Sequence, residues 1–188
     1  MVDEARMEQT PHGREPRGEG WFVLNAREAR WSHRPERGEM VALTGWTDEE
    51  CMTLFPHIGV NLYVLRPGEP IGVYHWEAET EEFLVLRGEA LLLVEGQERR
   101  LRQWDFVHCP PDTPHMIVGA VDAPCAVLAI GARGHGIDAA GWGGYVAAEV
   151  ARRHGVAPDE DTSDADRAYA RYAAPERVRY QDGWLPDG

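Results

Sequence analysis

The sequence predicts an all-β protein built as a sandwich or a barrel. Between residues 59 and 131, short apolar runs alternate with turn signals such as Arg87-Gly88 and Glu95-Gly96. Runs of roughly four to eight residues at this spacing are typical of all-β folds and do not fit alternating βαβ units. The chain has 188 residues, 43% of them hydrophobic, so it can bury one substantial core.

The expected strands follow one another through this central region. They are residues 60–65, 82–86, 90–94, 104–109, 116–118 and 125–130. Each run is apolar and lies between turn residues, as buried strands of a sandwich or barrel do. We therefore expect the barrel to occupy residues 59–133.

The flanking segments differ from the barrel in composition. Residues 1–20 are highly charged and carry almost nothing apolar, which predicts a mobile N-terminal tail. Residues 21–58 hold aromatic side chains scattered among charges, so we expect strands or an arm that packs on the barrel. Residues 134–188 are expected to form a C-terminal helical extension and tail.

Two short helices are expected in this C-terminal extension. Residues 145–154 are alanine-rich and precede Gly155, a residue type favoured just after a helix end. A second helix is expected to begin at Ser163 and to run to Tyr172, with Asp166 completing a weak capping box.

The net charge indicates which partners to expect. The formal net charge of -13 argues against a surface for nucleic acid or anionic membrane, which would need clustered basic residues, so small molecules are the expected partners.

The cysteines and the apolar runs bear on the cellular location. The sequence shows no signal-peptide core and no apolar run of about 20 residues. The three cysteines, Cys51, Cys109 and Cys125, lack the spacing of a disulfide framework, so a cytoplasmic location is expected.

Acidic and imidazole side chains concentrate at the start of the second apolar run. If residues 75–85 are extended, His75, Glu77 and Glu81 lie on one face, because side chains alternate across a strand. The competing interpretation is that they are solvated groups on an exposed strand, where charged residues usually lie.

Two motifs in this region resemble those of the cupin superfamily, in its small, single-domain cupin 2 type. The first, Gly-(X)5-His-X-His-(X)3,4-Glu-(X)6-Gly, is matched by His75 and Glu81, with Glu77 in place of the second histidine. The second is matched by Pro110 and His115. The resemblance implies a double-stranded β-helix, or jelly roll, with a metal ion inside it and pairing as a homodimer.

His75, Glu77, Glu81 and His115 are therefore the candidate metal ligands for one divalent ion per chain. Imidazole nitrogen and carboxylate oxygen together suit a divalent first-row metal. A carboxylate in place of a histidine favours zinc, iron, manganese or nickel over copper, and the sequence does not choose among these four.

His108 is the candidate catalytic residue, in a position that holds a pocket-facing aromatic side chain in many cupins. An imidazole titrates near neutrality and can act as a general acid or base. The alternative is a hydrogen-bonded histidine of the barrel wall.

The functional hypothesis is a metal-dependent enzyme, oxygenase-like or isomerase-like, that acts on a small organic substrate. Cupins host several activities on one scaffold, so fold alone does not decide the reaction. The first alternative is a non-catalytic cupin that binds or senses a sugar-like or acidic ligand. A second is a purely structural ion, held by four ligands in a closed site.

Overall fold

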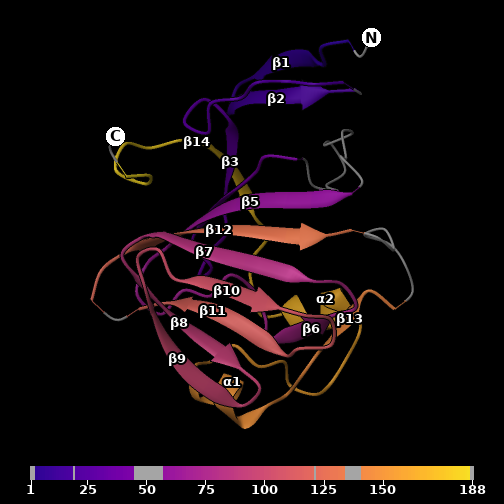
Figure 1. Ribbon diagram of the computed structural model, residues 1–188, viewed down its shortest axis with the longest axis vertical. Helices are drawn as coiled ribbons and strands as arrows, with labels where there is room; N and C mark the ends of the chain where they lie inside the picture. The colour runs from indigo at the N-terminus through magenta and orange to yellow at the C-terminus, as the bar shows by residue number, and fades with distance from the viewer. Residues whose placement is uncertain (1–2, 19, 45–56, 121, 134–140, 187–188) are drawn as a thin grey trace.

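The computed structural model describes residues 3–18, 20–44, 57–120, 122–133 and 141–186. It consists mainly of antiparallel strands with two short helices, and its two larger sheets form the layers of a jelly roll (Figure 1). The prediction of an all-β jelly roll with short C-terminal helices is confirmed. Neither described helix has the length or apolar character that crossing a membrane requires.

The strands belong to three sheets. In chain order they are β1 (Arg6–Thr10), β2 (Gly13–Arg17), β3 (Arg30–His33), β4 (Glu39–Ala42), β5 (Ile58–Leu65), β6 (His75–Glu77), β7 (Glu81–Arg87), β8 (Glu89–Val94), β9 (Gln97–Arg102), β10 (Phe106–Cys109), β11 (His115–Gly119), β12 (Cys125–Ala132), β13 (Gly143–Tyr145) and β14 (Glu176–Arg179). The seven-stranded sheet has the order β10-β7-β12-β5-β4-β3-β14, and the five-stranded sheet has the order β13-β6-β11-β8-β9. The third sheet is the hairpin β1–β2.

The main core lies between the two larger sheets. Strand β12 lies inside the seven-stranded sheet and pairs with β5 on one side and β7 on the other. Its Val127 packs with Val85 and Leu65 from the same sheet and with Ile117 from the opposite one, and all four are at most 1% exposed. Burial of such apolar surface is the main driving force of folding.

Two further clusters cover the outer faces of these sheets. Helix α1 (Glu149–Arg153) places Val150 against Leu93 and Met116, at the end of the molecule opposite the β1–β2 hairpin (Figure 1). On the seven-stranded sheet, Trp31 is fully buried and contacts the rings of Tyr180 and Trp184 at centroid distances of 5.9 and 5.1 Å. The C-terminal segment is thus anchored on the outer face of the sheet.

The N-terminal residues differ from the sequence-based expectation of a mobile tail. Residues 6–17 form the β1–β2 hairpin, and Ala5 just before it is 3% exposed. The charged side chains pair between strands: Arg17 of β2 pairs with Glu8 of β1 at 2.6 Å, and Glu15 of β2 pairs with Arg30 of β3 at 2.7 Å. Such ion pairs take the place of the apolar residues whose scarcity predicted the tail.

The C-terminal extension holds less helix than expected. Residues 143–145 form strand β13 beside β6, so α1 begins only at Glu149, after the N-cap residue Ala148. The second helix, α2 (Ala165–Tyr169), is capped by Asp164, whose carboxylate accepts hydrogen bonds from the backbone N–H groups of the first turn. Pairing with a neighbouring strand therefore overrides the helical preference of the first residues.

Two smaller expectations also have clear outcomes. The strand expected over residues 104–109 begins at Phe106, because Trp104 adopts a φ of 74° in the preceding turn. Cys109 and Cys125 are buried free thiols, while Cys51 lies outside the described residues.

Replacing Trp31 by alanine should lower the free energy of unfolding by about 3–5 kcal/mol, because the substitution leaves a large cavity beneath Tyr180 and Trp184. Denaturant titration measures this change. The matched control is Trp104→Ala, since Trp104 is 67% exposed and its loss should change the free energy by at most about 0.5 kcal/mol. Equal effects of the two substitutions would contradict the role assigned to the Trp31 cluster.

Candidate metal centre

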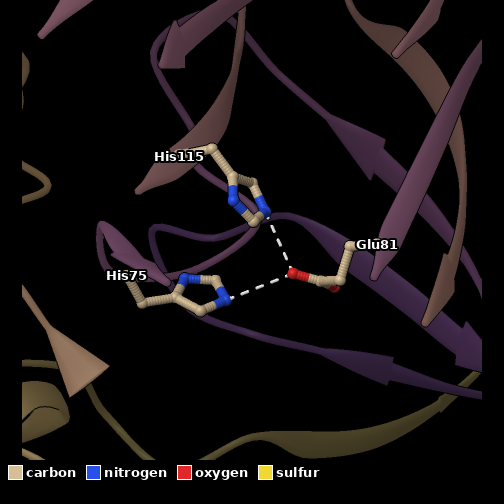
Figure 2. Close-up of side chains that lie close together, drawn as sticks. All are labelled: His75, Glu81 and His115. Carbon is tan, nitrogen blue, oxygen red and sulfur yellow. Dashed lines mark ion pairs between the residues drawn. The ribbon is translucent and has the colours of Figure 1, made fainter. Parts of the chain in front are cut away.

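Three strand ends bring His75, Glu81 and His115 together. His75 opens β6 and His115 opens β11, and the antiparallel register sets these two residues directly opposite each other. Glu81 opens β7 in the facing sheet. One donor atom from each side chain lies within 4.8 Å of the other two, and Figure 2 shows the three side chains pointing toward one another.

The Glu81 carboxylate lies between the two imidazole rings. Its Oε2 atom is 3.0 Å from Nε2 of His115 and 3.5 Å from Nε2 of His75 (Figure 2). The His115 side chain is 2% exposed, whereas those of His75 and Glu81 are 14% and 16% exposed. The group is therefore shielded from bulk water but still reachable from one side.

Backbone carbonyls fix the orientation of both imidazole rings. Nδ1 of His75 lies 2.8 Å from the carbonyl oxygen of Val73, and Nδ1 of His115 lies 2.8 Å from that of Thr113. A proton on each Nδ1 satisfies these contacts and leaves each Nε2 free to act as a metal ligand. This is the usual arrangement around metal-binding histidines.

Two buried atoms of the group lack a well-directed hydrogen bond. They are Nε2 of His115 and Oε2 of Glu81, and both are shielded from solvent. A void of about 20 Å³ also touches His75, Glu81 and His115, which is room for roughly one small ion or water. A buried donor or acceptor without a hydrogen bond costs free energy, and a cation bound between these two atoms would remove that cost. The residues present thus fit a divalent metal ion.

A much larger cavity opens next to this group. Its volume is about 890 Å³, large enough for a small organic molecule. His75 and Glu81 line it, and Tyr63 lines both the cavity and the small void. Trp142 and Tyr145 extend the aromatic wall beside His75, with ring centroids 6.2 and 6.0 Å from the imidazole. An ion held by the group would therefore lie beside a cavity of substrate size.

The electrostatics of the metal-free group favour protonated imidazoles and an ionised carboxylate. Burial alone would lower the pKa of His75, but the carboxylates of Glu77 and Glu81 outweigh it and raise the pKa to about 10. For His115, burial is likewise outweighed by Cys109 and Glu81, and the pKa rises to about 9. Burial would raise the pKa of Glu81, but the two histidines lower it to about 2. Without a metal ion, the positive charge of the protonated imidazoles balances the negative charge of the carboxylate.

The fourth predicted ligand, Glu77, lies slightly apart from this group. Its Oε1 atom is 3.5 Å from Nε2 of His75, but Glu77 does not belong to the set whose donor atoms all lie within 4.8 Å. Glu77 also lines the large cavity. Its role as a ligand stays a prediction, and its position also permits contact with a bound substrate.

The side chain of His108 lies on the face of β10 that points away from His75, Glu81 and His115. The register of β10 and β7 sets His108 opposite Glu82, and its Nδ1 atom contacts the Glu82 carboxylate at 2.7 Å. Directly opposed residues share a face, so His108 and Glu82 point away from the face that carries Glu81. The side chain of His108 is 56% exposed and does not line the cavity. A catalytic role for it stays a prediction without support from this placement.

Several cavity residues escaped the sequence analysis. They are Arg34, Arg37, Tyr145 and Tyr169, which come from the β3–β4 turn, from β13 and from α2. None belongs to a motif with metal-ligand spacing. The turn-forming sequence Arg34-Pro35-Glu36-Arg37-Gly38 was a usable signal for a hairpin, but not for the direction of its arginines.

Residues 61–131 match the family model of the Cupin domain. The matched range contains all three donors of the group. No curated protein matches the chain.

Solved structures show partial similarity. A putative sugar phosphate isomerase from Acidithiobacillus ferrooxidans is 30% identical, with 42% of this chain and 52% of that chain covered and a TM-score of 0.40. A sugar phosphate isomerase from the cupin superfamily of Silicibacter pomeroyi is 32% identical, with 42% and 52% covered and a TM-score of 0.39. A Cupin 2 conserved barrel domain protein from Salinispora arenicola is 25% identical, with 49% and 72% covered and a TM-score of 0.41. The chain thus spans about half the length of the two isomerases.

The metal-free protein should lose stability as the pH rises from 6.5 to about 10. The raised pKa values of His75 and His115 stabilise the folded state fully below 6.5, and this contribution is lost as the pH passes through about 9 and 10. The lowered pKa of Glu81 acts at the other end, where stability is lost as the pH falls from 4.5 through about 2. Denaturant titrations in the presence of a chelator measure both limbs.

Glu81→Gln should flatten the alkaline limb, because it removes the carboxylate that raises both histidine pKa values. The control is Glu82→Gln, the adjacent residue on the opposite face, which should keep the full pH dependence. The same slope in all three proteins would rule out this electrostatic account of the group.

Proposed function

We propose that this chain, whose residues 61–131 are a cupin domain, is a metal-dependent enzyme that acts on a small organic substrate. One observation carries the proposal: a compact set of two imidazoles and one carboxylate lies beside a cavity of about 890 Å³. Within the described ranges, this is the only group of its kind. A site with three protein ligands next to a cavity leaves room for a substrate, as catalytic metal sites do.

His75, Glu81 and His115 would hold the ion through Nε2, Oε2 and Nε2. Two imidazoles with one carboxylate suit zinc, iron, manganese or nickel, and the same donor set serves in non-haem Fe(II) oxygenases. When bound, the ion supplies a Lewis acid that polarises an oxygen of the substrate. Oxygenase-like and isomerase-like reactions both fit this chemistry.

The surrounding residues supply proton transfer and shielding. Glu77 lines the cavity and contacts the ligand His75, so its carboxylate is placed to take up or return a proton of the substrate. Burial raises the pKa of Tyr63 to about 12, which keeps its hydroxyl protonated and able to donate a hydrogen bond. Trp142 and Tyr145 wall off one side and limit the access of water. Proton transfer by Glu77 favours an isomerase-like reaction.

Protein purified without added metal should contain about one divalent ion per chain by elemental analysis. Glu81→Gln and His115→Ala should both lose the ion, because each removes a donor from the compact group. Glu77→Gln is the matched control and should keep the ion while losing activity. Absence of metal in folded wild-type protein, even after reloading, would overturn the proposal, and loss of the ion in Glu77→Gln would make Glu77 a fourth ligand.

An open coordination position on the ion distinguishes a catalytic metal site from a closed structural one. Protein loaded with Mn²⁺ should carry exchangeable water on the ion, measured by the relaxation of water protons, because the three side chains leave other positions free. Slow relaxation with no exchangeable water would indicate a structural ion instead. A metal-loaded protein that binds a small acid or sugar but returns it unchanged would favour the non-catalytic alternative.

A further inference from the structure

The turn between β3 and β4 directs two arginines into the cavity. Arg34 and Arg37 lie at either side of a tight turn, in which the backbone N–H of Arg37 donates to the carbonyl of Arg34 at 2.8 Å. Both residues line the same cavity as His75 and Glu81. Two positive side chains therefore converge on a space that the metal group also borders.

Both arginines are deeply buried. Arg34 is 5% exposed and Arg37 is 9% exposed, and the Nε atom of each is buried without a hydrogen-bond partner. Neither guanidinium makes an ion pair with a carboxylate in the part of the chain that the structure describes. Buried charges are almost always paired, since an uncompensated charge in a protein interior is costly. The chain has a net charge of -13, yet no carboxylate among the described residues forms an ion pair with either arginine.

The contacts of the two guanidinium groups differ. Arg34 donates to the backbone carbonyls of Ile71 and Arg37 at 2.8 and 2.5 Å and lies 4.8 Å from the centre of the Tyr63 ring. Arg37 lies 4.8 Å from the ring centres of both Tyr169 and Tyr172. A cation–π contact uses the face of the guanidinium, so the N–H groups in the guanidinium plane remain available for hydrogen bonds. The hydrogen-bonding capacity of Arg37 is therefore left for a ligand.

We propose that Arg34 and Arg37 form a subsite for the anionic group of the substrate, a carboxylate or a phosphate. A guanidinium matches either oxyanion through two parallel hydrogen bonds, and such charge-assisted bonds are stronger in a water-poor site. Arg37 makes the direct contact, while Arg34 positions the turn and adds positive charge. Filling the subsite satisfies the unpaired N–H groups and neutralises two like charges.

The subsite extends the proposed function by naming the class of substrate, and it rests on that proposal. Tyr63 connects the two sites, because its ring lies beneath Arg34 while its side chain also lines the small void between the metal-binding residues. The substrate class that fits is a small organic acid or phosphate ester. Its anionic end lies on the arginines and its uncharged, oxygen-bearing part lies toward His75 and Glu81.

The test uses metal-free protein, so that the ion cannot bind the probe. Inorganic phosphate and malonate are titrated separately by calorimetry into wild-type protein and into Arg37→Gln. Wild-type protein should bind at least one of these anions, and Arg37→Gln should weaken that binding tenfold or more. The tighter of the two anions identifies the substrate group as phosphate or carboxylate.

Arg102→Gln is the control, because Arg102 is 83% exposed on β9 and its substitution changes the net charge equally. It should bind the anion as the wild type does. No binding of either anion to the wild type, or equal weakening in both variants, would overturn the subsite. Metal content measured on the same Arg37→Gln protein should match the wild type, so failure of the subsite is distinguishable from failure of the metal site.

A second measurement needs no variant. Phenylglyoxal modifies accessible arginines, and peptide mapping by mass spectrometry shows which ones react. Phosphate or malonate should protect Arg37 several-fold more than Arg102 in the wild-type protein. Equal modification of Arg37 with and without both anions would also contradict the proposal, even if Arg37→Gln did not fold.

Discussion

The carboxylate of Glu81 connects the two larger sheets of the jelly roll. It comes from the seven-stranded sheet, and both imidazoles that it contacts come from the five-stranded sheet. The direct pairing of His75 with His115 fixes the distance between the rings, so the carboxylate has one place to lie. A one-residue slip of either strand would turn one imidazole out of the barrel and destroy the group. The register of the sheets therefore determines the chemistry.

The cavity beside this group is bordered by opposite charges that come from different elements. Glu77 and Glu81 border it from β6 and β7, and Arg34 and Arg37 border it from the β3–β4 turn. Tyr63 lies between the two kinds of charge, because its ring contacts Arg34 and its side chain lines the small void together with Glu81. Under the proposed function, such an arrangement would bind a molecule with one anionic end and one metal-binding end in a single orientation. Specificity and reaction geometry then follow from the same set of residues.

The sequence was sufficient for the barrel and for the choice of His75, Glu81 and His115 as a group, but not for how they come together. The premise that residues 75–85 form one extended strand was wrong, because the chain turns between β6 and β7 and brings His75 and Glu81 together from facing sheets. The alternation of side chains, applied across strands, would have placed His108 with Glu82 on the outer face, but it requires the register of β10 against β7.

Other features depended on contacts between distant segments, which no local pattern reveals. The β1–β2 hairpin is tied to β3 by the ion pair between Glu15 and Arg30, and β13 pairs with β6. Arg34 and Arg37 line the cavity because the turn that carries them folds over it. From composition alone, such arginines are expected to be exposed to solvent. Expectations based on nearby residues were thus reliable for the strands of the barrel and weak for the segments that close it.

The pairing of β14 with β3 has a consequence for biosynthesis. Residues 176–179 complete a sheet whose neighbouring strand spans residues 30–33, whereas the three metal-binding candidates lie between residues 75 and 115. During translation, the barrel and its polar group can assemble while the edge of β3 and the indole of Trp31 still await their partners. A nascent chain at that stage has a formed interior and an open, aromatic edge, and an unpaired strand edge promotes aggregation.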